Sequence, residues 1–258
     1  FKTELILRIS GYPKLNFFRF CLWKIASTKI KYVICPTEET KNFLLKKKIF
    51  DKERVIFIPD PILNIKKINI LKKEKLETEF GKPFFLTIGR FTKQKNHIFL
   101  INFFAKNLQY LENHKLVIIG QGELENDYNK IIKDKKLEKK IEILGYKKNI
   151  FNYLSNAKCM ISCSLWEDPG FIMIESACVG TPIISSNCPN GPKEFIGKNE
   201  NGFIFNSNDE VSFKKALDDF IVSSKDSINK KLISAKKRSK LYTCFYNSKK
   251  LSDIINEN

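Results

Sequence analysis

The sequence lacks the features that would place it in several large classes of protein. It contains no apolar run near the roughly 18 residues that a membrane-spanning helix needs, and no signal-peptide pattern opens it. Its 7 cysteines are an odd number, and most lie in apolar runs, as small core residues do. No second Cys pair or His follows Cys159 and Cys163 at zinc-ligand spacing, and no Asp-x-Asp motif occurs. We therefore expect no metal site and a cytoplasmic protein.

Acidic residues are scarce relative to basic ones. The chain has 46 Lys and Arg against 28 Asp and Glu, a formal net charge of +18. This excess favours acidic partners, namely nucleic acid, anionic lipid head groups or phosphorylated substrates. No recognised nucleic-acid-binding motif is present and the basic residues are spread along the chain, so we expect no nucleic-acid partner.

The first part of the chain predicts the end of an α/β domain. Residues 1–61 contain three strand-like runs, and the first of them starts at residue 1, so we expect a fragment whose beginning is missing. A helix predicted over residues 14–29 mixes aromatic and basic side chains. Such a helix either lies on a membrane surface or packs on a sheet with its lysines in solvent, and we favour packing. Pro59-Asp60-Pro61 ends the third run and marks the predicted domain boundary.

The second part, residues 62–240, predicts a Rossmann-like domain. Residues 62–81 form a Lys- and Glu-rich connection, after which strands alternate with helices. The predicted strands are 84–88, 116–119, 141–144, 159–163 and 183–185, and the helices are near 96–108, 123–136, 148–156 and 171–179. This alternation argues for a doubly wound parallel sheet, whose ligands bind at the carboxyl edge. Residues 241–258 predict a terminal helix that packs back toward the first domain.

Two carboxylates eight positions apart mark one loop at that edge. Glu167 lies in a loop with Pro169 and Gly170, and Glu175 lies about one turn inside a short helix that begins at Gly170 or Phe171. The free amides and positive dipole end of this helix would face a bound anion. Glu175 could accept hydrogen bonds from hydroxyls of the same ligand. The stretch predicts a site for a phosphate-linked sugar.

Two further loops belong to the same edge. Arg90 and Lys95 bracket the loop after the first strand of the domain, and a guanidinium with an ammonium suits a diphosphate. Gly120-Gln121-Gly122 lacks the third glycine of the dinucleotide fingerprint and follows an internal strand, so it predicts no NAD cofactor.

The ordered motifs resemble the retaining glycosyltransferases of family 4. They are Thr87-Ile88-Gly89-Arg90 with Lys95, Val117 to Gly122, Ile143-Leu144-Gly145, and Glu167-x7-Glu175 with Gly180-Thr181-Pro182. That family has the GT-B architecture, in which two Rossmann-like domains face each other across a cleft. The resemblance is close over residues 83–205. It implies the donor-binding domain of a GT-B enzyme, preceded by the remnant of a second Rossmann-like domain.

The resemblance also implies roles for single residues. Arg90 and Lys95 would hold the donor diphosphate, and Glu167 would contact hydroxyls of the transferred sugar; we predict these three as catalytic. Glu175 would bind the ribose. The other predicted donor contacts are the backbone near Gly170, Phe171 and Ile172, the base-framing Tyr146, the loop glycines Gly89 and Gly120, and Ser10 at the end of the first strand.

The sequence thus predicts a glycosyltransferase that moves a sugar from a UDP-sugar to a lipid-linked or saccharide acceptor. Retention of configuration and independence of metal and cofactor follow from the resemblance. The reaction would serve polysaccharide or glycolipid synthesis at the inner face of the membrane, with an anionic membrane surface as a candidate partner. The alternatives are a fragment that binds nucleotide sugar without turnover and a basic nucleic-acid-binding protein.

Overall fold

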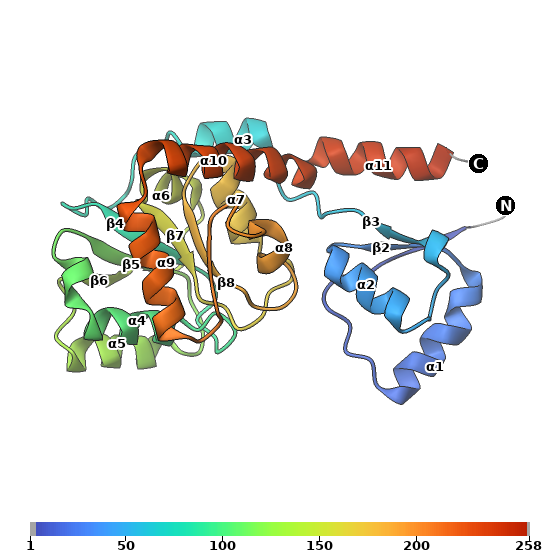
Figure 1. Cartoon of the computed structure of the whole chain (residues 1–258), viewed down its shortest axis with the longest axis horizontal. Helices are drawn as coiled ribbons and strands as arrows, with labels where there is room; N and C mark the ends of the chain where they lie inside the picture. The colour runs from blue at the N-terminus through green and yellow to red at the C-terminus, as the bar shows by residue number, and fades with distance from the viewer. Residues whose placement is uncertain (1–3, 257–258) are drawn as a thin grey trace. The chain divides into compact units, whose positions relative to one another are not determined.

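The computed structural model describes residues 4–256 and divides the chain into two compact units (Figure 1). The smaller unit comprises Phe1–Ile62 and Leu241–Asn258, and the larger comprises Leu63–Lys240. Residues 1–3 of the predicted first strand lie outside the described residues, as do residues 257–258. No helix within residues 4–256 is long and apolar enough to cross a membrane.

The smaller unit is built on a three-stranded parallel sheet in the order β1-β2-β3. Its elements are β1 (Leu5–Arg8), α1 (Phe17–Ala26), β2 (Ile30–Cys35), α2 (Glu38–Lys46), β3 (Val55–Phe57) and α11 (Cys244–Asn256), with short 3-10 turns at Ser27–Lys29 and Lys52–Arg54. Asn16 and Thr37 begin α1 and α2, because each side chain accepts a hydrogen bond from the backbone amide three residues on. The helix predicted over residues 14–29 is therefore shorter than expected at its start.

The two faces of this sheet pack against different helices. Val33, Cys35 and Val55 belong to a core that includes Leu44 of α2 and Trp23 of α1. The alternate residues Ile34, Tyr32 and Ile56 pack with Ile254 and Leu251 of α11. Successive side chains of a strand point to opposite faces, so α11 covers the face opposite to α1 and α2.

The larger unit has a six-stranded parallel sheet in the order β6-β5-β4-β7-β8-β9. The strands are β4 (Phe84–Ile88), β5 (Lys115–Ile119), β6 (Ile141–Ile143), β7 (Cys159–Ser162), β8 (Ile183–Ser186) and β9 (Phe203–Phe205). The helices are α3 (Ile65–Leu71), α4 (His97–Lys106), α5 (Glu125–Asp134), α6 (Phe151–Asn156), α7 (Phe171–Val179), α8 (Pro192–Ile196), α9 (Glu210–Val222) and α10 (Lys225–Ser239), with a 3-10 turn at Leu108–Leu111. Another 3-10 turn, Lys240–Tyr242, spans the boundary with the smaller unit.

Helices cover both faces of this sheet. In Figure 1, α3, α6, α7 and α10 lie on one side and α4 and α5 on the other. The core on the α4 side is rich in phenylalanine: Phe85 stacks on Phe104, and Phe103 meets Phe213 of α9 edge to face. Each such ring is worth about 1.5–3 kcal/mol when fully buried. The predicted doubly wound parallel sheet is confirmed.

Three elements of the larger unit differ from the prediction, and one of them is the five-residue helix α8, which no predicted range covers. Residues 62–81, predicted as a connection, include α3, which begins at an Asn64 cap and buries Ile68. The edge strand β9 was not predicted at all. It is three residues long, lies between Asn201-Gly202 and Asn206, and is defined by its pairing with β8. A run that short has too little pattern of its own to show that it is a strand.

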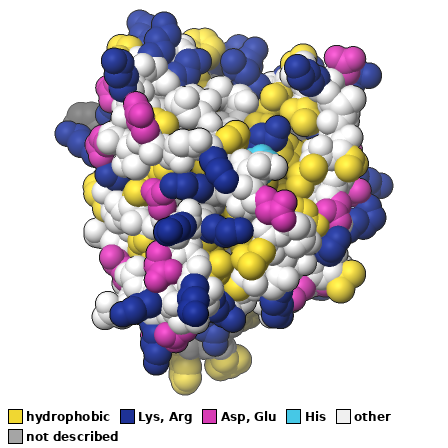
Figure 2. Space-filling view, turned by 90° about the vertical axis from the view of Figure 1, so that its left-hand side faces the viewer, with side chains coloured by type: hydrophobic (Ala, Val, Ile, Leu, Met, Phe, Trp, Pro, Cys, Tyr) yellow, Lys and Arg dark blue, Asp and Glu magenta, His cyan; other side chains and the backbone are white. Residues whose placement is uncertain are grey.

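Charge is distributed over the surface of the larger unit. Figure 2 shows Lys and Arg side chains spread among Asp and Glu over the face in view.

Candidate functional site

The strand order identifies one point on the edge of the larger sheet as the place where ligands of open α/β sheets bind. From β4 the chain proceeds to β5 and β6 on one side, and β7 then pairs with β4 on the other. Such a reversal leaves a crevice between the loops that follow the two central strands. The loops after β4 and β7 hold Arg90, Lys95 and Glu167, three of the predicted site residues.

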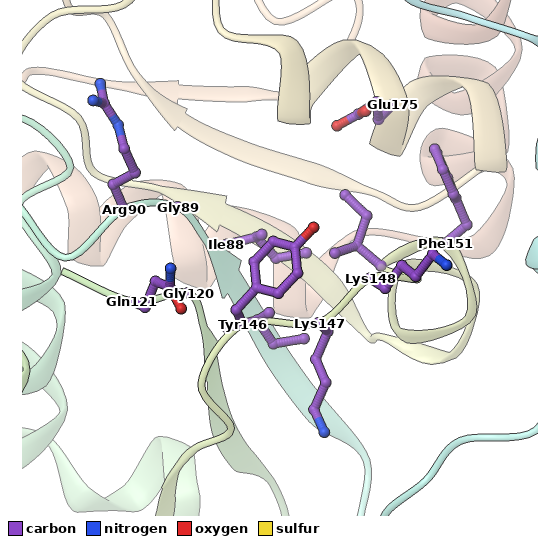
Figure 3. A pocket seen from close by; sticks show the side chains of 12 residues that line it. Ile88, Gly89, Arg90, Gly120, Gln121, Tyr146, Lys147, Lys148, Phe151 and Glu175 are labelled. Atoms are coloured by element: carbon purple, nitrogen blue, oxygen red, sulfur yellow. The ribbon is translucent and has the colours of Figure 1, made fainter.

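A pocket of about 470 Å³ opens at this edge (Figure 3). Its size is within the ordinary range for sites of small molecules and cofactors. It is lined by Ile88, Gly89, Arg90, Ile119, Gly120, Gln121, Tyr146, Lys147, Lys148, Ile150, Phe151 and Glu175. Five residues predicted from the sequence, Gly89, Arg90, Gly120, Tyr146 and Glu175, are thus brought together from four segments of the chain.

Glycine residues allow the loops after β4, β5 and β6 to pack directly on one another. Gly120 has a φ of 152°, and a Cβ there would lie 1.9 Å from the carbonyl oxygen of Gly89. The amide of Gly89 donates to Ile119 O at 3.0 Å, and the amide of Gly120 donates to Gly145 O at 2.9 Å. Any side chain at Gly120 would separate these loops, so glycine at this position allows the loops that line the pocket to pack closely.

The pocket has an aromatic end and a cationic end. Tyr146 is 68% exposed and lies near Ile88, Lys148 and Phe151 at one end. Arg90 stands at the other end, farthest from Phe151 in Figure 3. Its side chain is exposed and donates to Gln94 Oε1 at 3.3 Å. The pocket thus presents aromatic and apolar surface, with Lys148 beside it, at the Tyr146 end and a guanidinium at the other end.

Glu175 reaches into the pocket from α7 (Figure 3). No cation or hydrogen-bond donor among residues 4–256 pairs with its carboxylate. Burial, acting alone, raises the pKa of Glu175 from its ordinary value of 4.5 to about 7. A ligand that donates hydrogen bonds here would supply the partners that the protein does not.

Glu167 has the opposite environment. Its side chain is only 5% exposed, Lys95 Nζ lies 2.6 Å from Oε1, and Ser164 Oγ donates to the same oxygen at 2.5 Å. A Cβ at Gly89 would lie 3.0 Å from Lys95 Cγ, so the Lys95 stem crosses that glycine to reach Glu167. The sequence predicts Lys95 and Arg90 as two cations for one diphosphate, and in the structure their surroundings differ. Lys95 is bound to a carboxylate, and Arg90 lines the pocket.

The loop that carries Glu167 is fixed by residues that the sequence did not indicate. Gln94 Nε2 donates to Trp166 O at 2.9 Å, and the amide of Leu165 donates to Gln94 O at 2.8 Å. Asn190 Nδ2 donates to Asp168 Oδ1 at 2.6 Å. These partners lie 22, 71 and 72 positions away along the chain, so no local sequence pattern predicts them.

The start of α7 faces the same edge. Gly170 caps the helix with a φ of 88°, which favours glycine, Phe171 is 40% exposed, and Ile172 is buried. An α-helix leaves its first amides without partners inside the helix, and they form a positive end for an anion. Ser10 belongs to the smaller unit, where it follows β1 and is exposed.

His97, two residues after Lys95, is packed in the core of the larger unit. Its ring is 2% exposed, with Nδ1 3.2 Å from Thr87 Oγ1 and edge-to-face contacts to Phe91 and Tyr128. Burial, and then the nearby Lys95 ammonium, lower the pKa of His97 to about 3. The ring is neutral near pH 7 and acts as packing rather than as an acid or base.

The family follows from the part of the chain that contains this pocket. The sequence model of the family "Glycosyl transferases group 1" matches residues 69–239, nearly all of the larger unit. The chain belongs to the group 1 glycosyl transferases. The predicted fold, the Rossmann-like parallel sheet of a GT-B glycosyltransferase, agrees with this membership.

Individual relatives of this group 1 chain extend over both units. An uncharacterized glycosyltransferase of Methanocaldococcus jannaschii is 31% identical over 206 residues, 75% of this chain and 50% of that protein. The UDP-Gal:alpha-D-GlcNAc-diphosphoundecaprenol alpha-1,3-galactosyltransferase of Escherichia coli is 29% identical over 245 residues, 83% of this chain and 62% of that protein. The chain therefore spans roughly half to three fifths of the length of these relatives.

A solved structure shows the same fold. The glycosyltransferase from Rickettsia africae superposes with a TM-score of 0.82 at 19% identity, covering 98% of this chain and 70% of that one.

Proposed function

We propose that the larger unit binds a UDP-sugar, and that the protein moves the sugar to a lipid-linked or saccharide acceptor in polysaccharide or glycolipid synthesis. The pocket carries this proposal. It joins an aromatic end, an unpaired carboxylate and a guanidinium at the reversal point of a group 1 glycosyl transferase sheet.

The order of groups along the pocket matches the order of parts in a nucleotide sugar. The base would lie on Tyr146 and Phe151, and the ribose hydroxyls would donate to Glu175. The diphosphate would then face Arg90 and the first amides of α7, which favour negative charge. The sugar would extend toward Glu167 beyond them.

Transfer breaks the bond between the anomeric carbon and the diphosphate oxygen, and the electron pair leaves with the diphosphate. Charge that develops there is stabilised by Arg90, by Lys95 and by the α7 dipole, in a preorganised form of electrostatic catalysis. The acceptor hydroxyl oxygen forms the new bond to the same carbon with retention and without a metal, and its proton passes to the leaving diphosphate oxygen.

Lys95 has two candidate partners in this scheme. In the structure it is bound to Glu167, and a donor diphosphate nearby would compete for the ammonium. The competition would let Glu167 turn toward sugar hydroxyls as the donor arrives. Glu167 and Lys95 would thus act as a coupled pair rather than as independent contacts.

The name of the Escherichia coli relative supports the donor and acceptor classes. That protein is named for UDP-Gal and for a diphosphoundecaprenol-linked sugar. The chain spans only part of such relatives, so a second candidate is donor binding without turnover. Calorimetry with UDP and a panel of UDP-, GDP- and ADP-sugars tests binding, and a radiolabelled transfer assay with undecaprenyl-diphosphate-linked sugars, with and without EDTA, tests turnover.

The outcomes separate the candidates. Affinity for UDP-sugar with transfer that survives EDTA supports the whole proposal, and affinity without transfer supports the binding-only candidate. Absence of affinity for every nucleotide sugar overturns both. Salt-sensitive binding of DNA or RNA in a filter assay, tighter than binding of UDP-sugar, would restore the nucleic-acid alternative.

A further inference from the structure

The loop between β6 and α6 forms the aromatic end of the pocket. The residues of this segment that line the pocket are Tyr146, Lys147, Lys148, Ile150 and Phe151 (Figure 3). Asn149 lies among them in the sequence and does not line the pocket. Among residues 4–256, no backbone–backbone hydrogen bond involves residues 146–149. The position of this loop therefore depends on contacts made by its side chains.

The side-chain amide of Asn149 joins the start of α6 to the end of α3. Its Oδ1 accepts a hydrogen bond from the backbone amide of Phe151 at 2.9 Å. Its Nδ2 donates to Leu71 O at 2.9 Å and to Glu74 Oε2 at 2.8 Å. A carboxamide has two N–H donors and one carbonyl oxygen, so both hydrogens and the oxygen of this group have partners. The amide thus ties a residue of the pocket to a neighbouring helix.

Three further contacts attach the same two segments to each other. They are Lys147 Nζ to Glu77 Oε2 at 2.5 Å, Asn152 Nδ2 to Lys75 O at 3.1 Å, and Ser155 Oγ to Lys72 O at 2.9 Å. The first is an ion pair whose Glu77 side chain is 68% exposed, and exposed pairs contribute little to stability. The other two come from within α6, and neither Asn152 nor Ser155 lines the pocket. Asn149 therefore provides the main link between the loop and α3.

We propose that Asn149 is a positioning residue for the base of the donor nucleotide. In the proposed function, on which this inference rests, the base lies on Tyr146 and Phe151. The groups proposed for the ribose and the diphosphate, Glu175 and Arg90, belong to α7 and to the loop after β4. The side-chain hydrogen bonds of Asn149 go to neither of these segments. Loss of its amide would therefore release the base end of the pocket and leave the rest in place.

The size of the effect follows from how often the loop holds its position. A site that is competent for only part of the time binds its ligand more weakly in the same proportion. Without the Asn149 amide, the exposed Lys147–Glu77 pair is the remaining tie between the loop and the segment after α3. We expect the loop then to hold its position about a tenth of the time, which weakens UDP binding about tenfold.

The test is calorimetry on the full chain carrying Asn149→Ala, with UDP and inorganic diphosphate as the two probes. UDP should bind about tenfold more weakly than it binds wild type. Diphosphate has no base, so its affinity, measured by competition with UDP, should be unchanged. Hydrogen–deuterium exchange gives an independent readout. The Phe151 amide loses its acceptor in the variant, so peptides that cover residues 145–151 should exchange faster.

Asn152→Ala is the matched control. Asn152 also ties α6 to the segment after α3, through Lys75 O, but it does not line the pocket. It is 3% exposed, so its loss should lower stability while UDP affinity stays unchanged. Ser155→Ala removes a similar contact, to Lys72 O, at an exposed position and is the milder control. Circular dichroism checks that each variant folds.

The outcomes distinguish a failure of this inference from a failure of the proposed function. Wild-type protein that binds no nucleotide overturns the proposed function and this inference with it. Wild-type affinity for UDP that Asn149→Ala retains in full overturns the inference alone. Equal losses for UDP and diphosphate in Asn149→Ala would show a general role in folding and also overturn it. A loss of UDP affinity in Asn152→Ala as large as that in Asn149→Ala would do the same.

Discussion

Glu167 and Glu175 come from neighbouring segments of one motif, yet their surroundings differ in the property that matters for a buried carboxylate. Glu167, in the loop after β7, accepts a hydrogen bond from Ser164 and pairs with Lys95. Glu175, in α7, lines the pocket with no partner among the described residues, and burial raises its pKa to about 7. The protein itself therefore supplies hydrogen-bonding and ionic partners to Glu167, but not to Glu175.

The difference suggests that the two segments divide the work of the site. A satisfied carboxylate keeps its loop in place without a ligand, and its pairing must be rearranged before it can bind one. A buried carboxylate without partners lowers the free energy of unfolding. A ligand that donates hydrogen bonds to it removes this cost, so the free energy of ligand binding becomes more favourable. Variants that alter the surroundings of one carboxylate and not of the other test this division of work.

The largest effect is expected from Lys95→Met, which leaves Glu167 buried without its cation. The free energy of unfolding should fall by about 3–5 kcal/mol, as for other broken buried ion pairs. Urea unfolding followed by far-ultraviolet circular dichroism measures it. Lys95→Met/Glu167→Gln should recover much of the loss, because neither charge remains.

Lys106→Met provides the control for that experiment. Lys106 pairs with Glu210, but the two side chains are 61% and 43% exposed. The expected loss is at most about 1 kcal/mol, as for exposed pairs. Equal losses in the two Lys→Met variants would show that the Lys95–Glu167 pair is no more important to folding than a surface contact.

The next largest effect concerns donor affinity. Glu175→Ala and Arg90→Ala should each weaken UDP binding by about 1–3 kcal/mol, the contribution of a hydrogen bond to a charged group. Glu167→Gln should leave UDP affinity nearly unchanged and reduce binding or transfer of the sugar part. The exposed Glu138→Ala is the calorimetric control. Unchanged affinity in both Glu175→Ala and Arg90→Ala would contradict the assignment of the pocket.

A pH dependence of stability should distinguish the two carboxylates. The folded-state pKa of Glu175 is raised above the ordinary 4.5 to about 7, so the folded protein holds this proton more tightly than the unfolded chain does. Stability from this group is present below pH 4.5 and lost as pH rises through 7. Between pH 5 and pH 8 we expect a loss of about 1–3 kcal/mol in wild type that is absent in Glu175→Gln. Parallel pH profiles of the two proteins would refute the unpaired state of Glu175.

The smallest effect is expected from Asn190→Ala. It removes the hydrogen bond to Asp168 at 2.6 Å, and Asp168 is exposed to solvent. The loss in free energy of unfolding should be about 1 kcal/mol. Because the bond holds the loop of Glu167, sugar transfer should fall more than UDP affinity does. A loss of UDP affinity as large as that of Glu175→Ala would show that the two segments are not separate.

The layers of the larger unit and much of its pocket were predictable from the amino-acid sequence. Alternating apolar runs predicted β4, β5, β6, β7 and β8 and the helices between them, since burial on both faces requires such runs. The loops with Gly89, Gly120 and Tyr146 follow these strands, so their place at the carboxyl edge was also predictable. The strand β9 and the helix α3 escaped prediction because each is short and depends on its neighbours.

The pairing of the charged residues depends on the three-dimensional fold and was not predictable from the sequence. The order β6-β5-β4-β7 places the loops after β4 and β7 side by side. That adjacency brings Lys95 to Glu167 across 72 positions of the chain, while Arg90 lines the end of the pocket and donates to Gln94. Local patterns specify strands, but the order in which strands pair depends on the packing of the whole sheet. For the same reason, the sequence predicted both Glu167 and Glu175 as site residues, but only the fold shows that Glu167 has a partner.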